Sequence, residues 1–270
     1  MAPHLDLLHI ATQAAGRAGE YLQSIPRPDS TSWIRKGRAN FVTEVDRTAE
    51  QLIRQVLLDG VPGSTVVGEE LSPEVVTHGL VWIVDPLDGT TNFLHGVPGY
   101  AVSIAAAVDG VLETGVVLEL PSGRLFRASQ GGGAWLGDQR LRVSSIDEPA
   151  DALIGTGFPF TDFDNLEEYI GQLRRVIQRT SGIRRPGAAA LDLATVAAGA
   201  FDGFWEQRLS AWDIAAGIVL VREAGGRVTD FTGRDLGVEH ASVVAGNPMI
   251  HQWLLSQLNQ NAANLRSGPR

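Results

Sequence analysis

The chain has 270 residues, of which 44% are hydrophobic and 20% charged, so it can bury a large core and is not expected to be disordered over most of its length. The net charge of −9 and the sequence pI of about 5.1 disfavour a basic face for nucleic acid. The absence of cysteine excludes disulfides, thiolate nucleophiles and cysteine-based zinc sites, so any metal ion must be held by oxygen or imidazole.

The amino-terminal segment predicts a helix. Apolar residues recur at helical spacing over 4–24, and Pro26 then interrupts the pattern. Asp6, Arg17 and Glu20 break up the apolar character that a signal peptide requires. Because the chain also lacks any run of about 20 apolar residues, we expect a cytoplasmic protein without a membrane span.

The next elements predict helices packed on an antiparallel sheet. A second amphipathic helix is expected over 44–59, and the apolar runs favour strands at 66–68, 80–84, 100–108, 111–118 and 125–129. Asp109-Gly110 between two of these runs is a strong hairpin signal. We assign these elements to an amino-terminal half, residues 1–150, within one continuous domain.

Helices and strands alternate in residues 151–270, which predicts an α/β half. The expected strands are 152–155, 201–206, 228–231 and 242–245, and the expected helices are 166–179, 188–200, 212–224 and 249–258. Residues 184–187 are expected to form a loop, and the helix 188–200 is rich in small residues suited to close packing. No internal repeat is found.

The most informative segment is Trp82 to Phe93, where a buried strand ends in two carboxylates, Asp85 and Asp88. Pro86 fixes the backbone between them, and a kinked turn of this kind can aim both carboxylates and a carbonyl at one point. Gly89 permits close backbone approach and precedes a predicted helix start, whose N–H groups favour an anion. Alone, the pattern is equally compatible with a solvated turn or a calcium loop.

Two further carboxylates follow the same logic. Glu69 comes directly after a predicted strand, and Asp213 opens the predicted helix 212–224. Each has an ordinary explanation, an exposed helix start for the first and a helix N-cap for the second. Three carboxylate-bearing strand or helix ends in one chain instead favour a site for hard divalent cations, which oxygen ligands select.

At these residues the sequence resembles the inositol monophosphatase family, within the lithium-sensitive sugar-phosphatase superfamily. The resemblance rests on WIVDPLDGTTNF at 82–93, WDIAAGIVLVREAGG at 212–226, GEE at 68–70 and VTEVD at 42–46, and covers about residues 5–258. It implies a layered α-β-α-β-α fold, with an antiparallel sheet in the amino-terminal half and an α/β carboxyl-terminal half. It also implies a magnesium-dependent phosphatase.

Carried over by position, the resemblance implies two or three Mg²⁺ ions. Their ligands would be Glu69, Asp85, the Leu87 carbonyl, Asp88 and Asp213, with Asp85 bridging two ions. The catalytic residues would be Asp46, Thr90 and Glu69: Asp46 and Thr90 would orient and help deprotonate the attacking water, and Gly89 and Thr90 would donate backbone N–H groups to the phosphate. Metal would lower the pKa of the bound water and make an acidic pocket positive toward its anionic substrate.

The resemblance further implies substrate contacts from Glu206, Ala189 and Asp213, with Lys36 and Arg185 as additional candidates at a mobile loop and at the substrate mouth. Glu206 would accept hydrogen bonds from a sugar or inositol hydroxyl. The link at 207–211 departs from the glycine- or proline-containing link often seen in the family, which puts ring specificity in doubt more than catalysis.

The expected substrate is therefore myo-inositol monophosphate, hydrolysed by metal-activated water. Histidinol phosphate, fructose 1,6-bisphosphate and 3′-phosphoadenosine 5′-phosphate remain alternatives with the same mechanism. A non-catalytic regulator that binds another protein is an alternative of a different class, because fold resemblance does not fix function. Lithium inhibition and a homodimer are expected from the resemblance alone, and neither nucleic acid nor a membrane is expected as a partner.

Overall fold

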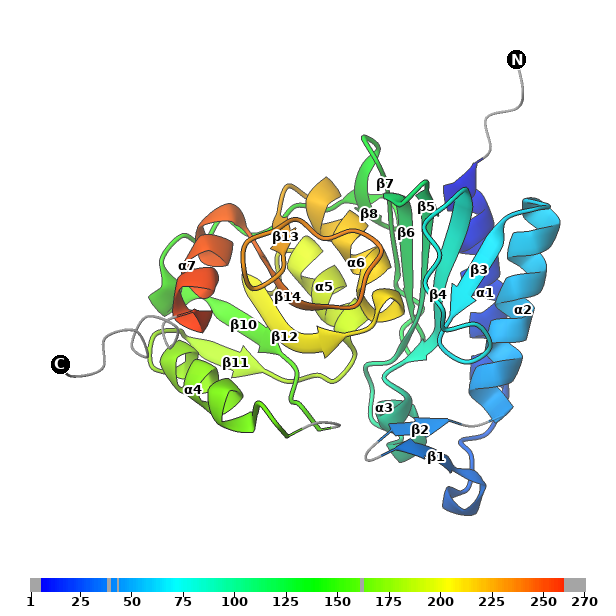
Figure 1. Cartoon of the computed structure of the whole chain (residues 1–270), viewed down its shortest axis with the longest axis horizontal. Helices are drawn as coiled ribbons and strands as arrows, with labels where there is room; N and C mark the ends of the chain where they lie inside the picture. Colours follow the sequence, from blue (N-terminus) through cyan, green and yellow to red (C-terminus); the bar gives the residue numbers. More distant parts are fainter. Residues whose placement is uncertain (1–5, 38–39, 43, 161–162, 260–270) are drawn as a thin grey trace.

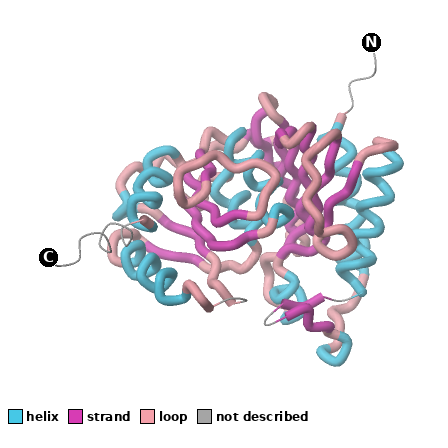
Figure 2. Tube along the Cα trace, viewed as in Figure 1, coloured by secondary structure: helices cyan, strands magenta, loops and turns pink. Residues whose placement is uncertain are grey.

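The computed structural model describes residues 6–37, 40–42, 44–160 and 163–259. Two β-sheets alternate with three layers of helices, in the order α-β-α-β-α (Figure 1). The same alternation appears in Figure 2 as strands that separate three groups of helices. Among the described helices, none has the length and apolar character needed to cross a lipid bilayer.

The first sheet has seven strands and is antiparallel except at one pair. Its order is β3 (Thr65–Gly68), β4 (Leu80–Asp88), β5 (Ala101–Val108), β6 (Val111–Glu119), β7 (Leu125–Ser129), β8 (Gly133–Leu136) and β9 (Gln139–Arg140). The predicted antiparallel arrangement is wrong for β3 and β4, which run parallel. The predicted hairpin joins β5 to β6, and positive φ angles at Asp109 and Gly110 match a tight turn of this kind.

The helices α1 (Leu7–Ser24) and α2 (Glu44–Gly60) cover the outer face of this sheet. The second sheet is mixed, in the order β11 (Gly182–Arg184), β10 (Leu153–Thr156), β12 (Gly203–Leu209), β14 (Ala241–Gly246) and β13 (Arg227–Thr229). Its outer face carries α4 (Leu166–Ile177) and α7 (Pro248–Leu258). This alternation agrees with the pattern predicted for residues 151–270.

The middle layer consists of α5 (Ala189–Ala197) and α6 (Ala211–Glu223), which pack on each other and are buried on almost every side. Small residues make this possible. A Cβ added at Gly115 in β6 would lie 2.4 Å from the carbonyl oxygen of Ala216, and one added at Gly217 would lie 2.4 Å from Leu193. The close approach of α6 to the first sheet brings the start of α6 to the end of β4.

Several short elements were not predicted. They are β1 (Ile34–Gly37), β2 (Asn40–Val42), β8, β9, β11 and two 3₁₀ turns at Ser30–Ser32 and Pro149–Asp151. Arg184, predicted in a loop, ends strand β11. The strand predicted over 80–84 continues through Pro86 to Asp88, with a register shift against β5 between Asp85 and Asp88. A short helix, α3 (Thr90–His95), begins where one was predicted.

The packing of β6 on α6 predicts opposite effects for two glycine substitutions. Gly115→Ala should lower the free energy of unfolding by about 1–3 kcal/mol, because its Cβ would clash with the α6 backbone. Gly16→Ala, in helix α1 with open space around the new Cβ, should raise it by about 0.5–1 kcal/mol. Urea unfolding of both variants would measure this, and equal effects would contradict the close approach.

Candidate active site

A pocket of about 560 Å³ opens between the two sheets, where the ends of β4 and β12 meet the starts of three helices. One wall comes from the β3 and β4 ends and the start of α3, and the other from the segments before α5 and α6. The pocket brings together most of the residues that the sequence singled out: Glu69, Asp85, Leu87, Asp88, Gly89, Thr90, Arg185, Ala189, Glu206 and Asp213.

Asp85 and Asp88 are buried by the irregular end of β4, at 2% and 7% relative exposure. The register shift makes the strand irregular at this point. The Leu87 N–H donates a hydrogen bond to Asp85 Oδ1 at 2.9 Å. Asp88 Oδ2 accepts a hydrogen bond of 2.8 Å from the Ala190 N–H, at the start of α5. Asp88 is thereby fixed to a helix from the other half of the chain.

Gly89 occupies a position that other residues would strain. Its φ of +84° is left-handed, and an added Cβ would lie 2.9 Å from the carbonyl oxygen of Gly99. The turn presents the Thr90 hydroxyl to two acceptors, the Leu87 carbonyl at 3.0 Å and Asp46 Oδ1 at 3.3 Å. The hydroxyl has one proton for these two acceptors, so a partner for the Leu87 carbonyl would leave the proton to Asp46.

Asp213 is the third residue of α6, where the sequence had offered a helix N-cap as its ordinary explanation. Ser210 is the N-cap, and the two residues form a reciprocal capping box. The Ser210 N–H donates to Asp213 Oδ2 at 2.7 Å. The capping role and the position in the pocket therefore coexist, since Ser210 uses only one of the two carboxylate oxygens.

Burial and mutual repulsion perturb the pocket carboxylates. Burial, with the charges of Glu69, Asp88 and Asp213, raises the pKa of Asp85 well above its usual range. Burial also raises the pKa of Asp88 and of Asp213 to about 7 each. A hydrogen bond between the side chains of Asp85 and Asp213 shows how closely these two acids approach. Such a cluster is fully ionised at neutral pH only if positive charge enters it.

The donor set fits a hard divalent cation. It consists of four carboxylates and the Leu87 carbonyl, all oxygen ligands of the kind that Mg²⁺ binds. As the side chains lie, no three acidic or histidine groups among the described residues already form a group that could hold an ion. Binding an ion therefore requires the carboxylates to turn toward a shared point, and a cation would replace their repulsion by attraction.

Two predicted residues remain, Asp46 and Lys36. Asp46 is buried in the first turn of α2 and reaches the site through its contact with Thr90. Lys36 belongs to strand β1, but its side chain lies outside the described residues, so its predicted role stays a prediction.

The opposite wall contains residues that the sequence did not single out. Phe158 and Phe160 line the pocket, and the Arg185 guanidinium lies 5.5 Å and 4.9 Å from the centres of their rings. Burial raises the pKa of Glu206 to about 8, and the Arg185 charge opposes this rise. An added Cβ at Gly157 would overlap the Glu206 carboxylate, so this glycine lets the loop close over Glu206. A strand followed by Gly-Phe-Pro-Phe carried no periodic signal from which this wall could be predicted.

The link 207–211, which departs from the family pattern, contains an unusual backbone. Arg208 has a φ of +57°, in the left-handed region that favours glycine, and the pairing of β12 with β14 shifts between Glu206 and Leu209. The irregular link connects β12 to α6. It allows Glu206, before the link, and Asp213, after it, both to line the pocket.

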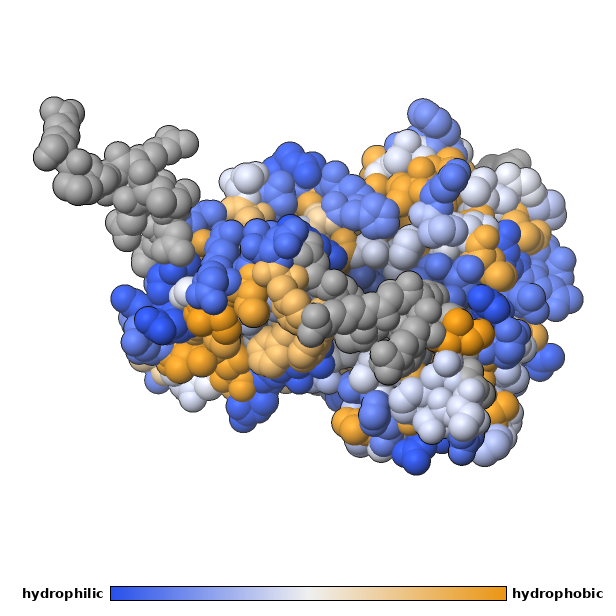
Figure 3. Space-filling view, turned by 60° about the horizontal axis from the view of Figure 1, so that its bottom comes forward, coloured by the Kyte–Doolittle hydropathy of each residue, from blue (hydrophilic) through white to orange (hydrophobic). Residues whose placement is uncertain are grey.

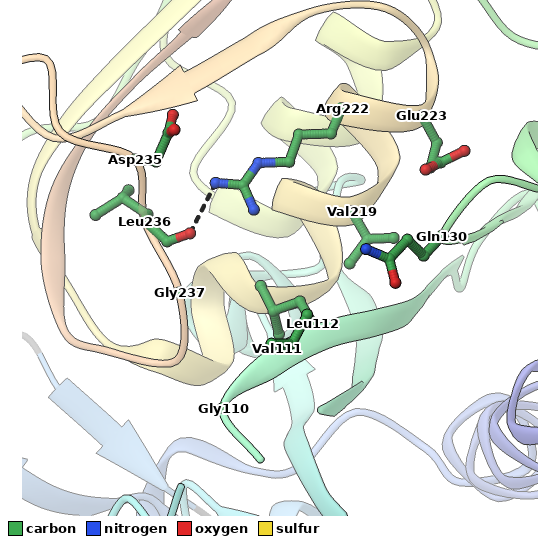
Figure 4. A pocket seen from close by; sticks show the side chains of 10 residues that line it. All are labelled: Gly110, Val111, Leu112, Gln130, Val219, Arg222, Glu223, Asp235, Leu236 and Gly237. Atoms are coloured by element: carbon green, nitrogen blue, oxygen red, sulfur yellow. Dashed lines mark hydrogen bonds between the residues drawn. The ribbon is translucent and has the colours of Figure 1, made fainter. Parts of the chain in front are cut away.

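A second pocket, of about 350 Å³, lies at the far end of α6 (Figure 4). Arg222 and Glu223 from that helix end face Gln130 and the segment Asp235–Gly237, and Arg222 Nη2 donates to the Leu236 carbonyl at 2.7 Å. This pocket contains none of the predicted site residues, and the chemistry singled out by the sequence belongs to the first pocket.

Comparisons with known proteins identify the family of this chain. A model described as the inositol monophosphatase family matches residues 5–263. The Nus factor SuhB of Pseudomonas aeruginosa is 48% identical over 258 residues, covering 93% of this chain and 95% of the relative. The inositol-1-monophosphatase of Rhizobium meliloti is 46% identical over 250 residues, covering 92% and 94%. The crystal structure of the extragenic suppressor protein suhB from Bartonella henselae has a TM-score of 0.85 at 41% identity, covering 93% of this chain and 98% of that one. The predicted layered fold is confirmed.

The raised pKa values predict that the ion-free protein loses stability as the pH rises. Unfolded aspartates and glutamates titrate near pH 4, whereas Asp88, Asp213 and Glu206 in the folded chain titrate at about 7, 7 and 8. Between about pH 4 and pH 8 the folded state binds more protons than the unfolded chain, so raising the pH lowers the free energy of unfolding.

Thermal unfolding in a chelator at about pH 5 and pH 8 measures this effect, and the melting temperature should be lower at the higher pH. Asp213→Asn, which cannot ionise, should reduce the difference. Mg²⁺ should raise the melting temperature more at pH 8 than at pH 5. A melting temperature that rises with pH would contradict the assignment of the shifts.

Proposed function

The chain belongs to the inositol monophosphatase family, and from this we propose that it hydrolyses a small phosphate monoester, myo-inositol monophosphate, with Mg²⁺ as the ion. Membership supports a metal-dependent phosphatase as the broader class. The observation that carries the proposal is the convergence of four carboxylates on one pocket beside the glycine turn that begins α3.

Glu69, Asp85, Asp88, Asp213 and the Leu87 carbonyl would hold two or three ions in this proposal. Bound there, Mg²⁺ would supply positive charge next to the phosphoryl oxygens and lower the pKa of a water molecule. The backbone N–H groups of Gly89 and Thr90 would hold the phosphate, since the first turn of a helix favours an anion. All four carboxylates are then ligands, and none is left to serve as a covalent nucleophile.

The water-directing group in the proposal is the pair of Thr90 and Asp46. The Thr90 hydroxyl lies 3.3 Å from the buried Asp46 carboxylate, so a proton taken from water by the hydroxyl can pass on to Asp46. The water oxygen forms a bond to phosphorus as the bond from phosphorus to the ester oxygen breaks. The departing alkoxide takes a proton from solvent water, and Asp46 returns to solvent the proton that it received. Asp46 and Thr90 come from α2 and α3, two helices whose apolar side chains belong to one hydrophobic core.

The opposite wall supports a neutral polyol as the alcohol. Glu206 accepts hydrogen bonds from hydroxyls, and Arg185 donates them from between the Phe158 and Phe160 rings. Hydroxyls are the groups that inositol monophosphate presents around its ring, which supports this ester as the substrate within the proposal.

A regulatory, protein-binding role is the second candidate, and the name Nus factor of the Pseudomonas aeruginosa relative favours it. Exposed hydrophobic side chains gather over the α4 region, visible at the left of Figure 3. They include Phe158, Phe160, Phe163, Ile170 and Ile177. This apolar surface supports an interaction with another protein. A homodimer and lithium inhibition remain proposals from family resemblance.

Asp85→Asn should lower kcat for inositol 1-phosphate at least about 10²-fold, because it removes one negative charge at the centre of the ion site. Asp138→Asn, at an exposed side chain that makes only a surface ion pair, is the matched control and should leave kcat unchanged. Phosphate release with and without Mg²⁺ measures both. An unchanged rate in Asp85→Asn would show that Asp85 is not part of the ion site.

The same variant separates the two candidate functions. If it lost all hydrolysis yet kept the biological role of the protein, the regulatory candidate would be favoured.

Arg185→Ala should raise KM for inositol 1-phosphate about tenfold or more and change kcat less, since it removes a charged hydrogen-bond donor to the ring. The same panel should include histidinol phosphate, fructose 1,6-bisphosphate and 3′-phosphoadenosine 5′-phosphate. Inositol 1-phosphate should have the highest kcat/KM in the unaltered protein. Much faster hydrolysis of histidinol phosphate would overturn the proposed substrate while leaving the phosphatase assignment in place.

A further inference from the structure

A second buried carboxylate lies on the inner face of α2, four residues after Asp46. This residue, Glu50, is completely buried, and residues at this spacing share one face of a helix. Glu50 does not line the pocket and is unrelated to the ligands implied by the family resemblance. Its neighbours on the same face of α2 are Ala49, Ile53 and Leu57, so an acid there needs an explanation.

The Glu50 carboxylate holds the turn that carries Glu69. Its Oε2 accepts a hydrogen bond of 2.7 Å from the N–H of Glu70. On the other side of the turn, the Glu69 N–H donates to the Val84 carbonyl of β4 at 3.2 Å. The backbone on both sides of the Glu69 side chain is therefore tied down, once to the sheet and once to α2.

The fit between Glu50 and the turn excludes even one extra carbon atom. A Cβ added at Gly68 would lie 2.2 Å from Glu50 Oε1, so the carboxylate rests directly on the backbone of this glycine. Arg54 completes the arrangement: its Nη1 lies 3.9 Å from Glu50 Oε1 and donates to Ser72 Oγ at 3.2 Å. The turn from Gly68 to Ser72 is thus held at both ends by side chains of α2.

The same helix supports two parts of one pocket wall. Asp46, in its first turn, contacts the hydroxyl of Thr90, while Glu50 in the next turn holds the backbone beside Glu69. Because α2 is a rigid helix packed on β4, the distance between the water-directing pair and the Glu69 turn is set by one element. Burial raises the pKa of Glu50, so the ionised carboxylate is less favourable here than in water.

We propose that Glu50 is a positioning residue: through the N–H of Glu70 it fixes the turn from Gly68 to Ser72, so that Glu69 faces the pocket in the orientation that ion binding requires. This rests on the proposed function for the role of Glu69 as an ion ligand. Groups that orient metal ligands through hydrogen bonds typically change metal affinity or activity 10–100-fold when removed.

The test uses Glu50→Ala and Gly68→Ala, which disturb the same contact from its two sides. Calorimetric titration of the ion-free proteins with Mg²⁺, without substrate, should give a dissociation constant about 10–100-fold higher in both variants. The Mg²⁺ concentration for half-maximal phosphate release should rise in parallel, while KM for the ester at saturating Mg²⁺ changes little. Glu50→Gln keeps an acceptor oxygen for the Glu70 N–H and should recover much of the affinity.

Glu74→Ala, at an exposed glutamate a few residues along the same connection, is the matched control and should titrate like the unaltered protein. A role in stability alone would lower the melting temperature of the two variants without changing the Mg²⁺ affinity of the folded protein, and that result would overturn the proposal. If Glu50→Ala does not fold, Gly68→Ala decides. If the unaltered protein binds no divalent ion, both this proposal and the proposed function are wrong; normal affinity in the variants would overturn this proposal alone.

Discussion

Repulsion among carboxylates in a confined space is the constraint on which the rest of this structure depends. Asp85, Asp88, Glu69 and Asp213 line one pocket, and the charges of Glu69, Asp88 and Asp213 all raise the pKa of Asp85. The surrounding fold opposes this repulsion with backbone donors. Asp88 accepts from the start of α5 and Asp213 from the start of α6, while α3 begins at the turn after Asp88. Helix starts carry partial positive charge, so their arrangement around the pocket offsets part of the negative charge.

The layered architecture brings the starts of three helices, α3, α5 and α6, to one pocket. α5 and α6 lie between the sheets, and only glycine and alanine side chains let α6 approach β6 and α5 so closely. The Asn92 side chain in α3 donates to the carbonyls of Gly99 and Pro186, which joins the two pocket walls through one residue. The small residues of the middle layer therefore help to determine where Asp213 lies.

The sequence predicted the long elements and the pocket residues of β4, α3 and α6, because these depend on local periodicity and on two long family signatures. It failed where tertiary contacts decide the structure. The short strands β8, β9 and β11 exist through pairing with neighbours, and the parallel pairing of β3 with β4 has no local signal. Glu50 did leave a signal: it lies with Asp46 on the apolar face of an amphipathic helix. The partners that explain its burial lie twenty residues away, where no pattern within α2 could indicate them.

The repulsion among buried carboxylates also helps to distinguish the two candidate functions. A protein that acted only by binding another protein would need its surface, such as the exposed aromatic side chains beside α4, and not a buried cluster of acids. Buried carboxylates with raised pKa values oppose folding at neutral pH, and replacing such groups by apolar residues of similar size is often neutral or stabilising. Asp85, Asp88 and Asp213, together with Glu50, therefore make physical sense in a molecule that binds cations. A regulatory role at the surface is compatible with that chemistry, because the two sets of side chains occupy largely different parts of the molecule. Among the described residues, Phe158, Pro159 and Phe160 belong to both.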